Sequence, residues 1–183
     1  MPEPEHFTGS LDQLKDLIKL LSIRANALVH ETGARLQMAK DKLDEWDKSL
    51  SFYVYPMAHA YFHRFVAVTY LEFIEQFNED KQTKQVFEKM GIIYAQTAII
   101  DNAEFYRDYL SREQIVEIKE NIMQQFKELR REIIAITYLL QFRDKMLGTI
   151  GASDLDSYSR FLNAVQTAEG CYGRPSEWRY LYE

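Results

Sequence analysis

The residues with the clearest potential for chemistry are two histidines, His59 and His63, in the run HAYFHRF. A spacing of four residues places both imidazoles on one face of a helix, where they could supply two corners of a metal site. A working site needs a third ligand, and the Glu-x-x-His pattern of di-iron bundles occurs only at Glu3 and His6, in a proline-containing leader. The alternative is a pair of partly buried histidines bonded to carbonyls or carboxylates. We therefore predict no metal and retain His59 and His63 as the candidate ligands.

Other reactive side chains lack the neighbours that their chemistry requires. The run HETGAR is half of a zincin motif, but Arg35 stands where the second histidine belongs. A catalytic thiol at Cys171 would need a base or a helix N-terminus to lower its pKa, the sequence cannot show one, and we expect an inert thiol. The glycines form neither a dinucleotide-binding fingerprint nor a P-loop. We predict no catalytic residue and no cofactor on this chain by itself.

Composition narrows the class of protein. The 183 residues fit one domain, and 22 Lys and Arg against 28 Asp and Glu give a net charge of −6, which argues against a nucleic-acid partner. A single cysteine excludes an intrachain disulfide and favours a reducing compartment. The first ten residues lack the basic and apolar regions of a signal peptide. The most apolar stretch, 52–77, contains histidines, an arginine and glutamates, which predicts a buried central helix rather than a membrane span.

Helical periodicity of apolar residues covers most of the chain, and no alternating strand pattern is present. Capping boxes at Ser10–Gln13 and Ser111–Gln114 mark two helix starts, Pro56 suits the first turn of another helix, and Ser153 can cap a short last one. The apolar residues from Ile115 to Leu140 form the longest stripe of three- and four-residue spacing in the chain. This stripe predicts extended antiparallel helix packing. The expected helices cover about 11–48, 56–77, 85–100, 112–140 and 154–168.

This pattern predicts an all-α fold, an antiparallel bundle of four long helices plus a short fifth helix. We expect a disordered leader over residues 1–9, the helical bundle domain over 10–169, and an irregular aromatic tail over 170–183. The tail aromatics should dock at least partly, because exposed aromatic clusters are sticky.

The segment IYAQTAIIDNAEFYRDYLSREQI resembles the C-terminal helical domain of the acyl-CoA oxidase family. The runs ALVHETGARL and MAHAYFHRFV are similar to earlier helices of that domain, with His59 at the family's histidine position. The run LRREIIAITYLLQFRDKMLGTIGASDLDSYSRFL is similar to its closing segment, although Ala152-Ser153-Asp154 replaces the usual Tyr-Asp-Gly. The resemblance covers about Leu21–Leu162. The matching positions are Tyr94, Asn102, Phe105, Tyr109, Leu110, Ser111, Gln114, Asp144, Leu147, Gly148, Gly151 and Tyr158.

The resemblance implies a part of an enzyme of fatty-acid β-oxidation. In that family the FAD-binding framework and the catalytic glutamate lie in preceding domains, so no catalytic residue is carried over and FAD belongs to the parent enzyme. The implied partners are those flavin-bearing domains or a second copy in a homodimer, with fatty acyl-CoA bound only through the parent enzyme. The resemblance implies an intracellular, peroxisomal protein. The ending Leu181-Tyr182-Glu183 is not a peroxisomal tripeptide, which keeps the cytoplasm open.

Two other functions stay open at this point. The chain could be a free-standing helical interaction or scaffold protein derived from that domain. It could also carry an apolar ligand such as a fatty acyl chain, since a bundle rich in Phe and Tyr can enclose one. In each case we expect the chain alone to be colourless and to form no peroxide from acyl-CoA.

Overall fold

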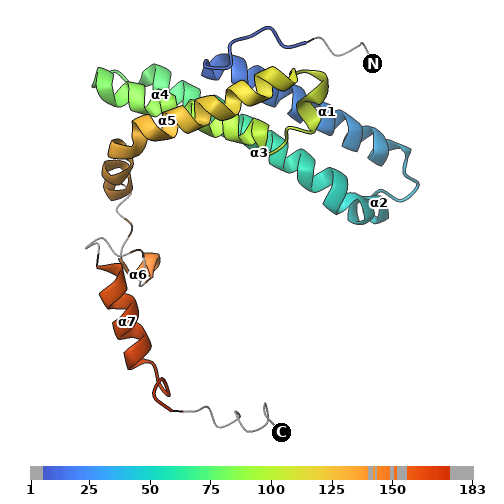
Figure 1. The fold of residues 1–183 in the computed structure, drawn as a ribbon. Helices are drawn as coiled ribbons and strands as arrows, with labels where there is room; N and C mark the ends of the chain where they lie inside the picture. The colour runs from blue at the N-terminus through green and yellow to red at the C-terminus, as the bar shows by residue number, and fades with distance from the viewer. Residues whose placement is uncertain (1–5, 140–141, 143, 149–150, 152–155, 174–183) are drawn as a thin grey trace. The chain divides into compact units, whose positions relative to one another are not determined.

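The computed structural model describes residues 6–139, 142, 144–148, 151 and 156–173 (Figure 1). All regular secondary structure in these residues is helical, which confirms the all-α prediction. A π-helical turn covers Leu50–Val54 and a 3-10 turn covers Phe105–Asp108. The α-helices are α1 (Leu14–Met38), α2 (Lys42–Ser49), α3 (Tyr55–Gln76), α4 (Lys81–Ile100), α5 (Arg112–Leu139), α6 (Asp144–Leu147) and α7 (Ser157–Thr167).

The chain divides into two compact units, and the boundary falls within α5. The first unit ends at Arg130 and holds α1 to α4 with most of α5, while the second begins at Arg131 and holds α6 and α7. The bundle domain predicted over residues 10–169 stays a prediction.

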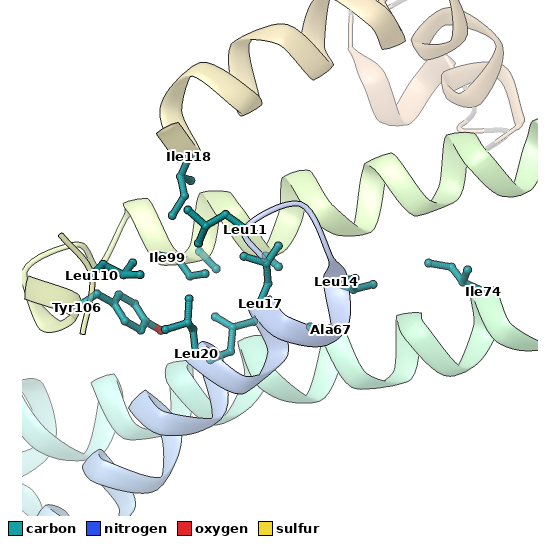
Figure 2. Close-up of a cluster of buried hydrophobic side chains, with 13 residues drawn as sticks. Leu11, Leu14, Leu17, Leu20, Ala67, Ile74, Ile99, Tyr106, Leu110 and Ile118 are labelled. Atoms are coloured by element: carbon teal, nitrogen blue, oxygen red, sulfur yellow. The ribbon is translucent and has the colours of Figure 1, made fainter. Parts of the chain in front are cut away.

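The core of the first unit forms where α1 and α3, which run in opposite directions, pack on each other and on α4 (Figure 1). Figure 2 shows the buried side chains converging from these helices, with Leu17 and Leu20 of α1 facing Ile99 of α4. Ile118 of α5 completes the cluster. Full burial of one such side chain contributes about 1.5–3 kcal/mol relative to exposure, so this cluster is the main source of the unit's stability.

The prediction that α3 is buried on all sides is wrong for the described chain. Its buried residues are only Ala60, Ala67 and Ile74, which lie seven residues apart on one face. On the opposite side Phe62 is 57% exposed and Phe65 is 54% exposed. An apolar sequence permits burial of every side, but the neighbouring helices α1 and α4 cover only one.

The first helix differs from the prediction at both ends. The capping box predicted at Ser10–Gln13 does not form. The hydroxyl of Ser10 accepts from the Asp12 N–H (3.2 Å), its N–H donates to Asp16 (2.9 Å), and the helix begins at Leu14. The helix passes Gly33 as predicted but ends at Met38, ten residues before the expected Lys48.

The early end of α1 has a local cause in the next helix. The carboxylate of Asp41 accepts from the N–H groups of Leu43 (2.9 Å) and Asp44 (3.2 Å), and so caps a new helix, α2. Asp side chains favour such caps over helix interiors because they compete for backbone hydrogen bonds.

Pro56 lies in the first turn of α3, as predicted, and the helical turn Leu50–Val54 leads directly into this helix. The N–H of Tyr55 donates to the carbonyl of Leu50, five residues back, which gives a widened π turn. Proline has no N–H, and its ring would collide with a carbonyl four residues earlier in a regular α-helix. The wider turn therefore relieves the collision and lets the chain continue as a helix.

The remaining predicted helices need smaller corrections. Helix α4 begins at Lys81 rather than at residue 85, because Asp80 caps it through the Thr83 N–H (2.7 Å). The apolar stripe of α5 is buried at Ile118 and Leu129 but exposed at Ile133, and the extended antiparallel packing predicted for it stays a prediction. Ser153 and the tail from residue 174 lie outside the described residues.

Two helical glycines provide a matched test of the packing. A Cβ on Gly91 of α4 would lie 2.8 Å from the Tyr70 ring and 3.0 Å from a Leu14 methyl, whereas a Cβ on Gly33 meets nothing within 4 Å. We expect Gly91→Ala to lower the free energy of unfolding by about 1–3 kcal/mol through overpacking. Gly33→Ala should raise it by about 0.5–1 kcal/mol through helix propensity. Urea unfolding of the full chain measures both, and equal effects would contradict this packing.

Candidate functional site

His59 and His63 come together as their spacing predicts. Their Nε2 atoms are 3.4 Å apart and their ring centroids 4.3 Å apart on α3. Tyr55 stacks on His59 and Tyr94 of α4 stacks on His63, so four aromatic rings form a continuous ladder. Across the described residues, no group of three or more His, Cys, Asp or Glu side chains is placed to hold a metal ion. The expectation of no metal stays a prediction.

The environment of His63 favours its neutral form. Burial, helped by the nearby charges of His59 and Arg24, lowers the pKa of His63 below its ordinary value of 6.5, while Asp101 opposes the shift. Its Nδ1 atom is buried and has no hydrogen-bond partner within the described part of the chain.

Arg24 of α1 is a further polar residue at this place, and the sequence analysis missed it. Its side chain is only 7% exposed, and burial lowers the pKa of its guanidinium, with Tyr106 opposing the shift. Tyr106 is fully buried, burial raises its pKa, and its hydroxyl has no partner in the described chain. A signal was present in the sequence, because Arg24 continues the apolar spacing of Leu17, Leu20 and Leu21.

The run HETGAR, residues 30–35, has a structural role in this fold. The hydroxyl of Thr32 donates to the carbonyl of Tyr53 (3.4 Å). Arg35 pairs with Glu45 and lies over the Tyr53 ring, 4.5 Å from its centroid. These contacts hold the end of α1 against the turn before α3. The thiol of Cys171 is exposed and lies 3.1 Å from the carbonyl of Gln166.

The segment that carries the resemblance forms the corner between α4 and α5. The capping box is confirmed, since the Ser111 N–H donates to Gln114 Oε1 (2.9 Å) and the Gln114 N–H donates to Ser111 Oγ (3.2 Å). Gln114 also donates to the carbonyl of Phe7 (3.2 Å), and Asn102 donates to that of Ala98 (2.8 Å). These hydrogen bonds fix the path of the chain at this corner.

The expectation that this chain alone holds no cofactor stays a prediction. A glycine-rich turn leading into a helix N-terminus is one common way in which proteins hold the pyrophosphate of a dinucleotide cofactor. Gly33 and Gly91 lie inside helices, and Gly148, with a φ of 69°, follows the short helix α6. The described helices also include none long and apolar enough to cross a membrane.

Comparison with known proteins decides the family. The family model described as acyl-CoA oxidase matches residues 13–183. The chain belongs to the acyl-CoA oxidase family. The resemblance seen in the sequence is thereby confirmed. No curated protein is similar enough in sequence to count as a match to this member of the family.

Two solved structures of plant acyl-CoA oxidases share its fold. LeACX1, an acyl-CoA oxidase from Lycopersicon esculentum (tomato), matches 94% of this chain with a TM-score of 0.71 and 15% sequence identity. Acyl-CoA oxidase 1 of Arabidopsis thaliana matches 95% with a TM-score of 0.73 and 13% identity. The matches cover only 27% and 28% of those two chains. This acyl-CoA oxidase family chain therefore corresponds to a helical part of a longer fold.

The depressed pKa of His63 predicts a loss of stability in acid. The unfolded chain titrates at the ordinary 6.5 and the folded chain lower, so the unfolded state binds more protons as the pH falls below that value. We expect the free energy of unfolding to decrease as the pH falls through this window. His63→Phe, which keeps a ring for stacking on Tyr94, should flatten that dependence. Asp101→Asn should steepen it, because it removes the charge that opposes the shift.

Urea unfolding at pH values on both sides of the window measures these slopes. An unchanged slope in His63→Phe would show that another group causes the acid sensitivity.

Proposed function

We propose that this chain is a non-catalytic helical part of an FAD-dependent acyl-CoA oxidase of fatty-acid β-oxidation, and that it packs on the flavin-bearing part. Family membership supports the reaction class, and the small share of the plant oxidases that the chain spans supports a partner larger than the chain itself. The observation that carries the docking role is the open aromatic face of α3. We define this face by Tyr55, Tyr61, Phe62 and Phe65.

The aromatic face of α3 has the properties of a contact surface. Its four side chains are exposed, and they lie on the side of the helix away from Ala60 and Ala67. Soluble proteins seldom leave a contiguous group of large apolar side chains in water unless a partner covers it. Aromatic residues are also the commonest anchors of protein interfaces.

Helix α7 of the second unit has a similar open face. Tyr158, Phe161, Leu162 and Val165 follow the three- and four-residue spacing of one helix side, and all four are exposed. An amphipathic helix of this kind gains stability when its apolar side is covered. Considered by itself, the second unit thus supports the same role of binding to neighbouring protein.

The chemistry of the reaction supports different roles for this chain and for the flavin-bearing part of the enzyme. Oxidation of an acyl-CoA at its α and β carbons needs a carboxylate that removes the α proton and a flavin that accepts a hydride. We infer that the flavin-bearing part supplies both, and the exposed apolar faces of this chain suit assembly with it. Packing on the flavin-bearing part would also support the homodimer and would bring the chain to the compartment of the whole enzyme, the peroxisome.

Substitution of the aromatic face tests this role. The chain is co-expressed with the flavin-bearing part of the oxidase from the same source, and affinity is measured by calorimetry on the separated partners. We expect Phe62→Ser with Phe65→Ser to weaken the complex by about 10- to 100-fold, or ~1.4–2.7 kcal/mol, because both rings lose buried contacts. The helical circular dichroism of the chain should not change, since both side chains are exposed when it is alone.

The matched control is Val116→Ser with Met123→Ser on α5. These two side chains are 50% and 48% exposed, comparable with the two phenylalanines, but lie outside the aromatic face. The control should bind like the unsubstituted chain. Equal loss in both double variants, or flavin absorbance and acyl-CoA-dependent peroxide formation by the chain alone, would overturn the proposal.

A further inference from the structure

Arg24 is a buried cation without a counter-ion. The ion pairs of the described chain do not include it, and no hydrogen bond of its guanidinium to a described residue is present. The neighbouring arginines differ, since Arg35 pairs with Glu45 and Arg64 donates to Ser22 Oγ (3.1 Å). A guanidinium has five N–H donors, and removing it from water without a partner is costly. Within the described residues its N–H donors are therefore left for water or a bound molecule to accept.

A hollow lies beside this guanidinium. Arg24 lines a cavity of about 350 Å³ in the first unit. Leu28, Pro56 and Phe105 give the cavity apolar walls. Asp101 and Glu104 lie on the same lining and make it partly acidic. The cavity thus combines apolar walls with Arg24, two carboxylates and the amide of Asn102. Apolar walls with a few polar groups are the usual composition of a small-molecule site.

Two buried polar atoms near Arg24 have no hydrogen-bond partner among the described residues. They are the hydroxyl of Tyr106 and Nδ1 of His63, and both lie close enough to Arg24 for its charge to act on their ionisation. Figure 2 shows the Tyr106 side chain directed toward α1, with its hydroxyl beside Leu20, one turn before Arg24. Buried polar groups are nearly always hydrogen-bonded to protein or water, so these two atoms and the guanidinium of Arg24 can take hydrogen bonds from water or from a bound molecule.

We propose that this cavity binds an aliphatic monocarboxylate, with its carboxylate on Arg24 and its alkyl chain against Leu28, Pro56 and Phe105. A planar carboxylate matches the fork of a guanidinium through two parallel hydrogen bonds. A phosphate dianion fits less well, because it would meet stronger repulsion from Asp101 and Glu104. The site is separate from the aromatic face of α3 and does not depend on the docking role.

Titration of the full chain with hexanoate tests the site. Calorimetry should give saturable binding with one hexanoate per chain. Hexanol, which lacks the charge, and acetate, which lacks the alkyl chain, should each bind at least 10-fold more weakly, and so should inorganic phosphate. Equal affinity for hexanol and hexanoate, or no saturable binding of hexanoate, would overturn the proposal.

Substitutions of Arg24 assign the binding to this residue. Arg24→Met should weaken hexanoate binding at least 10-fold and should leave the Tm without hexanoate unchanged or higher, since it removes an unpaired buried charge. Arg24→Lys, which keeps the charge but loses the fork, should weaken binding less. Arg107→Met is the matched control, because Arg107 is exposed and adjacent to Tyr106, and it should not change the affinity. Undiminished binding in Arg24→Met would place the carboxylate elsewhere.

Asp101→Asn separates the proposed site from an internal ion pair. Asp101 is exposed, so the variant should fold, and loss of its negative charge should tighten hexanoate binding by about 2- to 5-fold. If Asp101 instead serves as the counter-ion of Arg24 in solution, this variant will have a lower Tm without hexanoate and no gain in affinity. That result would overturn the site.

Discussion

The contact on which the rest of the structure depends is the leucine side of α1 against α3 and α4. Leu17 and Leu20 are fully buried there, and small residues on the facing helices let the backbones approach closely. Ala67 of α3 and Ala95 of α4 are buried in the same cluster. Close approach matters because protein interiors are packed as densely as organic crystals, so a larger side chain at such a position would separate the helices.

The same side of α1 also carries the polar residue Arg24, near the middle of the helix. Four residues after Leu20, the stripe places Arg24 where an apolar side chain would be expected, and the helix geometry leaves it buried. The corner after α4 brings Tyr106 over this point, and α3 brings His63. The continuous packing along α1 therefore brings Arg24, Tyr106 and His63 close to one another. The cavity beside Arg24 follows from the ordinary helix packing of the first unit.

The fold class could be predicted from the sequence because apolar periodicity reports which side of a helix is buried. The capping box at Ser111 was predictable for a different reason. Both of its hydrogen bonds join residues three apart in the sequence. The end of α1 was not predictable, because the Asp41 cap competes with a helical pattern that continues past it. The unpartnered state of Arg24 depends on residues about 40 and 80 positions away, and periodicity holds no information on those contacts.

The orientation of α3 explains why its aromatic face is open. Consecutive residues are about 100° apart around a helix, so Phe62, two residues after Ala60, lies about 200° from it. Phe65, two residues before Ala67, is turned away from the core by the same angle in the other sense. Once Ala60, Ala67 and Ile74 pack inward, both phenylalanines must point outward. Rotation of α3 cannot bury these two rings without exposing Ala60, Ala67 and Ile74, so their exposure follows from the packing of the core.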